Sequence, residues 1–233
     1  MNLKIKYQTL KAVLREIADF AGSNASTLPV LRHVLISPRE NQALLACTNL
    51  NCFAYVTLPA VVDLSGAPEG LPGITVPVAP FLALLSAMPA VEEVKLTFDS
   101  KTAALKILAG GSSTTLKGLP EEEFPPAPGI PEGEGVATLS LAQEEWAALN
   151  RAAYAAARDE SRPALTGVLL DTTSGNLVAV SADGFRISVK AIAANVGKGK
   201  QAILPLEAVE KLNKILSGKG AVKARLDAAR ILV

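Results

Sequence analysis

Apolar positions recur along the chain in two alternating periods. Between Leu10 and Phe20 they recur every three to four residues, which is the period of a helix with one buried face. The stretch 28–36, LPVLRHVLI, is apolar at nearly every position, as in a buried strand. Helical and strand-like segments alternate in this way through the sequence. The pattern predicts an α+β fold in which two helices pack on antiparallel sheet.

The same pattern occurs twice. With a shift of 134 residues (163 − 29 = 134), Pro29 aligns with Pro163 and Leu35 aligns with Leu169. The alignment continues through the next strand and, after one gap, through a second helix that follows a matched proline in each copy. Three blocks in the same order indicate a structural duplication.

The duplication predicts two domains. One covers residues 1–120 and the other covers 136–233, and the linker 121–135 between them is rich in proline, glycine and glutamate. The first copy closes with the strand-like run SSTTLKGL, for which the second copy has no counterpart. We therefore expect the second domain to lack its last strand, so that its sheet keeps an unpaired edge or another segment fills the gap.

Composition narrows the function classes. The chain has 233 residues, of which 49% are hydrophobic, so it can form sizeable cores. It contains no apolar run near the roughly 20 residues needed to span a bilayer, and its start does not resemble a signal peptide. The net charge of +1 argues against nucleic-acid binding by overall basicity and leaves room for local basic stripes. We expect a cytoplasmic protein without membrane contact.

Few side chains could support catalysis. His33 is the only histidine, and its place in an apolar strand is more typical of a structural residue. Cys47 and Cys52 are five apart in an expected strand, which would direct them to opposite faces and disfavour a disulfide. The run AGGSS at 109–113 precedes neither a lysine nor a helix and is typical of a hairpin turn. The acidic runs are typical of solvated surface, with a carboxylate-only Mg²⁺ site as the alternative. We expect no enzyme activity, no cofactor and no transition-metal site.

Five blocks of the sequence resemble one known family. Between Leu3 and Val233 they read TLPVLRHVLI, GITVPVAPFLALLSAMP, LKGLPEEEFP, ESRPALTGVLL and VSADGFRISV. They are similar to the bacterial sliding clamp, the beta subunit of DNA polymerase III. The resemblance implies a ring of repeated domains, each with two inward helices and outer sheets. Such a ring encircles duplex DNA and tethers polymerase subunits, the clamp loader and repair proteins through short peptide motifs, without catalysing a reaction.

The resemblance covers only the first two of the family's three domains. Family chains close a six-domain ring as dimers, and three copies of a two-domain chain would also supply six, so a homo-oligomer is expected for a ring. Two hypotheses stay open: a processivity factor, whole or truncated, and a shortened, non-encircling relative that acts as a protein interaction module. Basic pairs on helices favour the first, whereas the charge-free helix near 76–88 and the low net charge favour the second.

A sliding ring must attract phosphate without fixed contacts, which suits lysine and arginine on the inward helices. The candidate DNA-binding residues are Lys11, Arg15, Arg151, Arg158, Arg162, Lys211 and Lys214. Three pairs are spaced four, seven and three residues apart on expected helices, so the members of each pair should share a helix face. Solvated surface is the alternative for each pair. The resemblance also implies DNA contacts from the loops GSNAST and RDESR, although Ala25 stands at or near a position where the family often has arginine.

The resemblance further implies a peptide-binding groove on the second domain. The matching positions are Leu165, Ala182, Gly184, Phe185 and Ile187. They offer a small apolar wall, a glycine that permits close backbone approach, and an aromatic ring to cover an inserted leucine or phenylalanine. Phe185 replaces the family's usual histidine. A core position is the alternative for Leu165 and Ile187. Because the family completes the groove with its third domain, we expect little or no peptide affinity for this chain alone.

Overall fold

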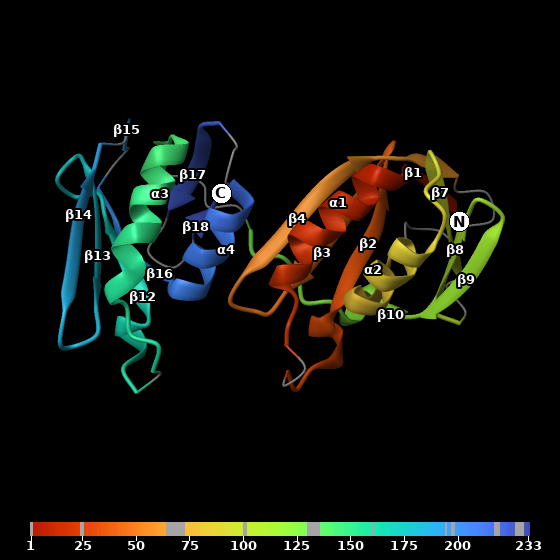
Figure 1. Ribbon diagram of the computed structural model, residues 1–233, viewed down its shortest axis with the longest axis horizontal. Helices are drawn as coiled ribbons and strands as arrows, with labels where there is room; N and C mark the ends of the chain where they lie inside the picture. Colours follow the sequence, from red (N-terminus) through yellow and green to blue (C-terminus); the bar gives the residue numbers. More distant parts are fainter. Residues whose placement is uncertain are drawn as a thin grey trace. The chain divides into compact units, whose positions relative to one another are not determined.

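The chain forms two compact units, Met1–Ala127 and Pro128–Val233. The computed structural model describes residues 2–23, 26–63, 73–99, 102–129, 136–159, 161–193, 195–196, 199–216, 220–226 and 231–233 (Figure 1). The two units, called the first and the second unit below, are each described by themselves.

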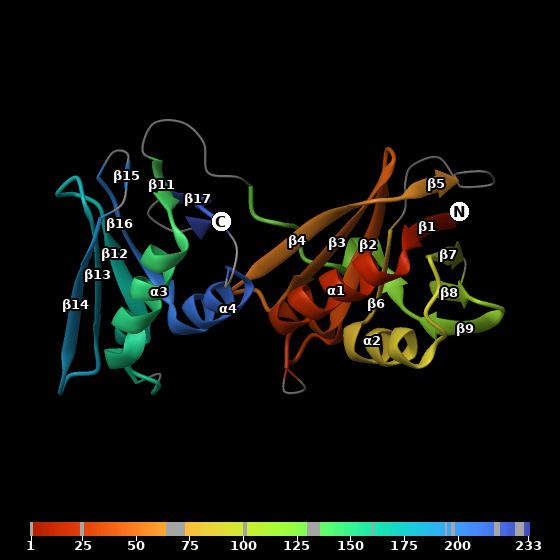
Figure 2. The ribbon, with the colours of Figure 1, turned by 45° about the horizontal axis from the view of Figure 1, so that its top comes forward.

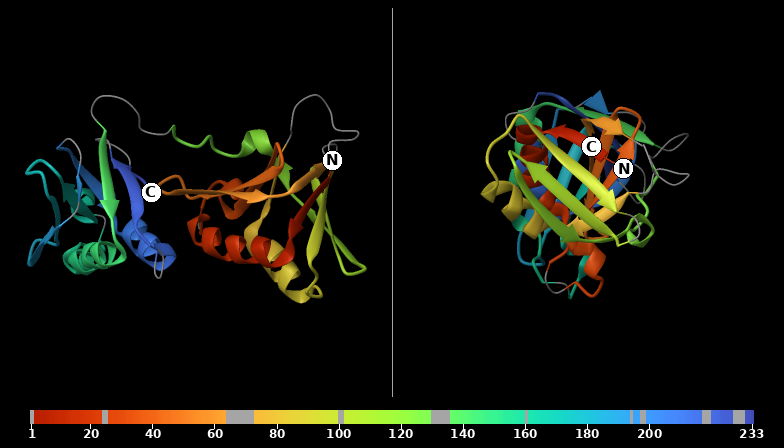
Figure 3. Two further views of the ribbon diagram at one scale, coloured as in Figure 1. Left: turned by 90° about the horizontal axis from the view of Figure 1, so that it is seen from above. Right: turned by 90° about the vertical axis from the view of Figure 1, so that its right-hand side faces the viewer.

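The first unit packs two helices against two antiparallel sheets. Its helices are α1 (Tyr7–Ile17) and α2 (Val78–Ala87), which contact each other on one side of the strands (Figure 3). In the described residues the sheets have the orders β5-β1-β7-β8-β9 and β10-β6-β2-β3-β4. The strands are β1 (Asn2–Lys6), β2 (His33–Arg39), β3 (Gln42–Thr48), β4 (Phe53–Pro59), β5 (Val61–Asp63), β6 (Ile74–Pro77), β7 (Glu93–Asp99), β8 (Ala104–Ala109), β9 (Ser112–Lys117) and β10 (Leu119–Pro120).

The second unit repeats this plan. Its helices α3 (Gln143–Ala152) and α4 (Leu206–Leu216) also pack together beside two antiparallel sheets (Figure 2). In the described residues the sheets have the orders β15-β11-β17-β18 and β14-β13-β12-β16. The strands are β11 (Ala137–Leu141), β12 (Gly167–Asp171), β13 (Leu177–Ala182), β14 (Ile187–Ile192), β15 (Asn195–Val196), β16 (Gln201–Pro205), β17 (Val222–Leu226) and β18 (Ile231–Leu232).

Strand register confirms the duplication. Leu35 of β2 lies opposite Ala46 of β3, and Leu169 of β12 lies opposite Val180 of β13. Both residues of the second pair are shifted by 134 from the first (169 − 35 and 180 − 46). The predicted α+β class with duplicated, antiparallel halves is therefore confirmed. Among the described residues, the second unit has no strand equivalent to β9 or β10.

Helix α1 shows how the apolar period becomes packing. Leu10, Leu14 and Ile17 are all buried, and their spacing places them on one face. The helix begins where the Tyr7 backbone N–H donates to the Glu92 carbonyl over 3.0 Å. The Tyr7 hydroxyl donates to the Leu85 carbonyl of α2 over 2.7 Å, which fixes the two helices against each other.

The predicted strand at 28–36 is wrong in its first half. Residues Pro29–Arg32 form a 3₁₀ turn, η2, and the strand begins only at His33. The second unit has the matching turn η5 at Pro163–Leu165. Proline has a fixed φ and lacks an N–H, so it fits the first position of a helical turn better than the interior of a sheet.

The first residues of the expected linker pack against the first unit. We call Leu119–Phe124 the closing segment. Leu119 lies opposite Thr75 in the β10–β6 pair, and the 3₁₀ turn η3 (Glu121–Glu123) then leads to Phe124. Phe124 is 9% exposed and packs in a buried cluster with Val30, Leu35 and Ala46, with Leu119 against it. This segment belongs to the first unit because its apolar side chains cover an apolar sheet face.

The prediction that Cys47 and Cys52 lie in the same strand is wrong. Strand β3 ends at Thr48, and Cys52 lies in the turn that follows. Both thiols are buried, and the two cysteines form no disulfide with each other. Burial raises the pKa of Cys47 to about 12, so this thiol stays protonated at neutral pH. The predicted hairpin at 109–113 is confirmed, since Gly110 and Gly111 turn the chain with φ of 54° and 82°.

Candidate DNA-facing and peptide-binding surfaces

Lys11 and Arg15 share a face of α1, as their spacing predicts. The Lys11 ammonium lies 5.4 Å from the centre of the Tyr7 ring and donates to the Tyr7 hydroxyl over 3.2 Å. Lys11 is half-buried, whereas Arg15 is exposed one turn further on. Because Tyr7 is itself bonded to α2, the charge of Lys11 is held in one place while that of Arg15 faces solvent.

Helix α2 offers no charge beside this pair. Its exposed residues are small or uncharged: Ala79, Pro80, Ala83, Ser86 and Ala87. Of the two helices of the first unit, only α1 therefore carries basic side chains.

The predicted pairing of Arg151 and Arg158 on one helix is wrong. Arg151 is exposed in the last turn of α3, but α3 ends at Ala152 and Arg158 lies in the loop beyond the 3₁₀ turn η4 (Ala153–Ala155). Beyond η4 the backbone is extended at Ala156, with ψ of 143°, and the Ala157 N–H donates to the Leu165 carbonyl over 2.9 Å.

Arg158 is also engaged by an acidic side chain. Its Nη2 lies 3.2 Å from Oε1 of Glu210 on α4. The two side chains are 79% and 51% exposed, so the pair is screened by water and weak. Glu210 nevertheless lowers the net positive charge that this loop can offer to phosphate.

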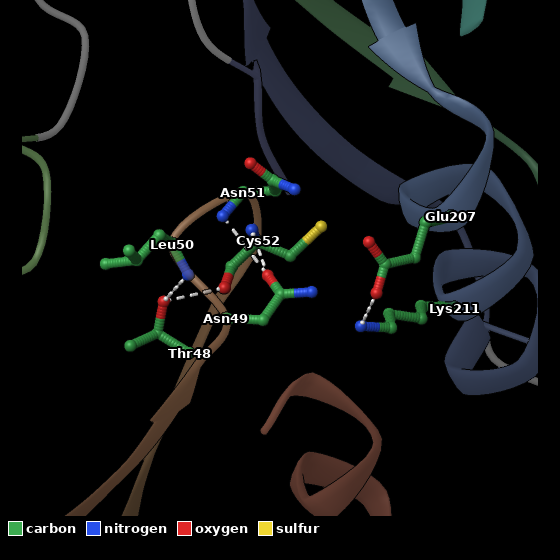
Figure 4. Close-up of polar contacts among 7 residues, drawn as sticks. All are labelled: Thr48, Asn49, Leu50, Asn51, Cys52, Glu207 and Lys211. Atoms are coloured by element: carbon green, nitrogen blue, oxygen red, sulfur yellow. Dashed lines mark hydrogen bonds and ion pairs between the residues drawn. The ribbon is translucent and has the colours of Figure 1, made fainter. Parts of the chain in front are cut away.

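Helix α4 carries its own counter-charge. Lys211 Nζ lies 2.5 Å from Glu207 Oε1, one turn earlier, and the lysine side chain is only 14% exposed (Figure 4). Lys214 is exposed on the next turn. Of the predicted α4 pair, Lys214 is thus the more exposed member.

The two predicted loop sites differ in what the structure describes. Ala25 lies outside the described residues. Arg162 is exposed at the start of η5, and its Nη1 lies 3.3 Å from the place where a Cβ on Gly184 would stand. The structure therefore brings Arg162 to the candidate groove residues.

The turn between β13 and β14 is organised by Asp183, which the sequence interpretation missed. Asp183 Oδ1 accepts from the backbone N–H groups of Phe185 and Arg186, each over 3.0 Å. Its Oδ2 accepts from Arg186 Nε over 2.8 Å. The two backbone hydrogen bonds lower the pKa of Asp183, so the carboxylate stays ionised well into acid. The aspartate-glycine pair between two apolar runs was the available clue.

This turn presents an aromatic side chain to solvent. Phe185 is fully exposed, and next to it the Arg186 guanidinium lies 5.6 Å from the centre of the exposed Tyr154 ring. Tyr154, on η4, was also missed, because nothing in the local sequence relates it to a residue 32 positions away (186 − 154). Arg186 thus contacts one exposed aromatic ring, Tyr154, and directly follows another, Phe185, in the chain.

The first unit contains the same turn. Asn49 Oδ1 accepts from the N–H groups of Asn51 (3.2 Å) and Cys52 (2.8 Å), and the intervening Leu50 has φ of 74° (Figure 4). Gly184, the residue equivalent to Leu50, has φ of 93°. The glycine therefore meets a requirement of the turn itself, in addition to the open surface that it leaves for a ligand.

The remaining groove positions lie at the same end of the hairpin. Ala182 and Ile187 face each other across β13 and β14, next to the turn. Ile187 is 64% exposed, which rules out the alternative of a plain core position for it. Leu165 is half-buried on η5, three residues after Arg162. Four of the five predicted groove residues are thus brought together, with Arg162 beside them.

The described residues contain no helix long and apolar enough to cross a membrane. Within the same part of the chain, no group of three or more histidine, cysteine, aspartate or glutamate side chains is placed to hold a metal ion.

Comparisons with known proteins agree with this layout. Residues 1–128 match the family described as DNA polymerase III beta subunit, N-terminal domain, and residues 141–233 match its central domain. The beta sliding clamp of Chlamydia pneumoniae is 29% identical over 239 residues, which cover 100% of this chain and 61% of the relative. That of Pseudomonas aeruginosa is 30% identical over 221 residues, which cover 93% and 57%.

Solved structures show the same fold. The crystal structure of the DNA polymerase III subunit beta from Pseudomonas aeruginosa aligns with a TM-score of 0.83 at 24% identity, covering 100% of this chain and 62% of that one. The chain thus spans about three fifths of the length of the relatives that it matches.

Proposed function

Because this chain belongs to the DNA polymerase III beta subunit family, the bacterial sliding clamps, we propose that it is a processivity factor or a part of one. In this role it surrounds duplex DNA together with further domains and tethers polymerase and repair proteins to it. The observation that carries the proposal is that both units match consecutive domains of the family in the family's order. The role is mechanical, requires no catalysis and is exercised in the cytoplasm.

In this role, the helical side of each unit contacts the DNA. Arg15, Arg151 and Lys214 are exposed on three of the four helices and would meet phosphates without a fixed geometry. Lys11 adds a positioned charge. Arg158 and Lys211 contribute less because Glu210 and Glu207 accompany them. The resulting attraction is weak, which favours sliding over tight binding.

Peptide tethering falls to the β13–β14 turn. Phe185 and Ile187 expose apolar surface beside Ala182 and Gly184, and Arg162 supplies a nearby donor. Partner proteins would insert an apolar side chain of a short motif here.

A topological test separates encircling from simple binding. The purified chain is first sized by light scattering, and it is then loaded, with a clamp loader if required, on nicked circular DNA. We expect retention on the circle during gel filtration at 0.5 M salt, about five times the ionic strength at which the Debye length is about 10 Å. Linearising the DNA should release the protein. Equal retention on both forms would contradict an encircling role.

A charge reversal tests the DNA-facing residues. Arg15→Glu should weaken DNA binding at low salt and reduce its salt dependence by about one counter-ion per contact. Lys4→Glu is the matched control, because Lys4 is exposed on β1 and not on a helix. If both variants lose the same affinity, the helical side is not the DNA-facing side.

A second function has one observation in its favour. Helix α2 has no charged residue, and Arg158 and Lys211 have acidic partners, so few uncompensated positive charges remain to attract DNA. A non-encircling interaction module would accordingly bind clamp-binding peptides through the Phe185 turn and show no topological link to circular DNA.

A further inference from the structure

Two lysines lie directly opposite each other in the β5-β1-β7-β8-β9 sheet of the first unit. Lys4 of β1 pairs with Lys95 of β7, and both residues are exposed. Like charges at opposed positions, with Cβ atoms about 4.5–5.5 Å apart, destabilise a sheet. Within the described part of the chain, neither ammonium group has an ion pair. The sheet therefore holds two uncompensated positive charges side by side.

The second unit forms the same sheet without this pair. Ser140 precedes α3 by three residues, as Lys4 precedes α1, and it lies opposite Lys223 of β17. A lysine thus stands at the place of Lys95 in both units, and only the first unit has a second lysine across from it. The repulsion between Lys4 and Lys95 is therefore not required by the fold. Positions that break a local rule without structural need are typical of functional sites.

Apolar side chains stand at both ends of the lysine pair. Val61 of β5 lies opposite Lys4 and is 62% exposed, and Leu108 of β8 lies opposite Lys95 and is partly exposed. We call Val61, Lys4, Lys95 and Leu108 the lysine row. The row crosses four neighbouring strands on one face of the sheet. The residues that alternate with it along β1 and β7 are buried, so the row faces away from the core.

The length of the row suits a helix. Three inter-strand spacings of about 4.8 Å separate Val61 from Leu108, so the row is about 14 Å long. On a helix, positions i, i+3, i+7 and i+10 share one face and span about 15 Å. Four alternate residues of an extended segment would span about 20 Å, which exceeds the row. The complementary ligand is thus a helix that carries two carboxylates between two apolar side chains.

Acidic residues around the row disfavour a nucleic acid. Glu93 lies two residues before Lys95 on the same face of β7, and Asp99 lies four residues after it. Asp63 lies diagonal to Lys4 across β5 and β1. A phosphodiester backbone carries closely spaced negative charges and would meet these carboxylates as well as the lysines. Two carboxylates on a helix would meet the lysines alone.

We propose that the lysine row is a docking surface for an acidic amphipathic helix of a partner protein. The helix places its two carboxylates on the ammonium groups of Lys4 and Lys95, and one apolar side chain on each of Val61 and Leu108. Charge complementarity speeds the encounter and selects the partner, and the apolar ends add buried area. The surface lies on the first unit, is separate from the Phe185 turn and from the helices, and does not rest on the proposed function.

A designed peptide tests this surface. The helix AAQLAQEAAQEAQLAAQ, acetylated and amidated, carries two glutamates between two leucines at the required spacing. It is titrated into the isotope-labelled intact chain, and backbone amide shifts are recorded by NMR spectroscopy. We expect saturable shifts in β1, β5, β7 and β8. A peptide with glutamine in place of both glutamates should bind about tenfold more weakly, and alanine in place of both leucines should also weaken binding.

Charge reversal changes the row without unfolding the protein. In Lys95→Glu, as in Lys4→Glu, the remaining lysine gains an opposite charge across the strands, so thermal unfolding at low salt should move up by about 1–3 °C. Each variant should nevertheless bind the peptide about tenfold more weakly. Lys117→Glu is the matched control and should keep the affinity, because Lys117 is exposed on the same face, opposite Ala104 and outside the row. A purely structural lysine pair would not combine higher stability with lost binding.

DNA binding separates this proposal from the proposed function. Lys4→Glu should lose the peptide and keep the DNA affinity of the unchanged protein at low salt. The proposal is overturned if the peptide does not bind saturably, if the glutamine peptide binds as well as the original, or if Lys117→Glu loses as much affinity as Lys95→Glu. A duplex DNA fragment that shifts the amides of the row, where the peptide does not, would assign the surface to nucleic acid and overturn it as well.

Discussion

The two units share a fold and a strand register, but one sheet face is buried in the first unit and partly exposed in the second. In the first unit the closing segment buries Leu35 and Ala46, and in the second the equivalent Leu169 and Val180 lie among exposed side chains. The difference does not originate in the strands, which are apolar in both units. A short flanking segment decides whether a sheet face is core or surface.

The largest effect should come from removing the cover of the first unit. Phe124→Ala is expected to lower its free energy of unfolding by about 3 kcal/mol, because a nearly buried ring leaves a cavity. Calorimetry would show an earlier transition for the first unit. Trp146, the only tryptophan, lies in the second unit, so its fluorescence transition should not move. Phe185→Ala, which truncates a fully exposed ring, is the control and should change stability by less than about 0.5 kcal/mol.

Gly167 tests how tightly the second unit fills the place of His33. A Cβ at this position would stand 2.6 Å from Ile203 Cγ2 and 2.7 Å from the Leu204 carbonyl oxygen. Gly167→Ala should therefore cost the second unit about 2 kcal/mol, measured by urea unfolding with Trp146 fluorescence. Gly220→Ala, where a Cβ meets no atom within 4 Å, should cost far less. If both substitutions changed the free energy of unfolding equally, backbone entropy and not packing would determine the loss of stability in Gly167→Ala.

The shared turn offers a reciprocal exchange of smaller size. Gly184→Ala should destabilise the second unit by about 1 kcal/mol, because an L side chain disfavours the left-handed region that φ of 93° requires. Leu50→Gly should stabilise the first unit by about 0.5 kcal/mol, since Leu50 already has φ of 74°. Thermal unfolding of both variants checks the pair. A destabilised Leu50→Gly variant would show that the packing of the leucine outweighs its strain.

The smallest predicted effect is a loss of stability of the first unit as the pH falls below neutral, caused by protonation of His33. Burial lowers the pKa of His33 and is the largest influence on it. The hydrogen bond with Thr75 and the charge of Glu123 raise this pKa, and the charge of Arg32 lowers it. The unfolded chain, with a histidine pKa of about 6.5, therefore takes up the proton first. The contribution of neutral His33 to the free energy of unfolding is therefore fully present above about pH 6.5. It is lost as the pH falls through the lower pKa that His33 has in the folded state. His33→Gln should abolish this decline in calorimetry between pH 7 and 5, and an unchanged profile would contradict it.

The sequence predicted the features that depend on local period and repetition. The helix around Leu10 and Leu14 and the register of the duplicated strands followed from apolar spacing, and both are confirmed. The apolar period did not predict the end of α3 at Ala152, and the chain beyond it is held by a hydrogen bond from the Ala157 N–H to Leu165 of another segment. The neighbours of Arg158 and the packing of Phe124 likewise depend on contacts between residues distant in sequence.

The candidate site was predicted in composition and only partly in arrangement. The family resemblance identified Ala182, Gly184, Phe185 and Ile187, which do lie together on one hairpin. It gave no indication of Asp183, whose carboxylate organises the turn, because a hydrogen-bond acceptor within a turn has no periodic pattern. The roles of these residues in binding stay predictions.

The Asp183 turn has a thermodynamic consequence for any ligand of Phe185. Two backbone hydrogen bonds hold the turn before a partner arrives, so its backbone has little conformational freedom left to lose on association. Only the two side-chain torsions of the phenylalanine must be fixed, and an ordering cost of about 0.5–1.5 kcal/mol per immobilised side chain is small for the apolar area that a ring supplies. A fully exposed aromatic residue on a preformed turn can therefore contribute to affinity mainly through a slower dissociation rate.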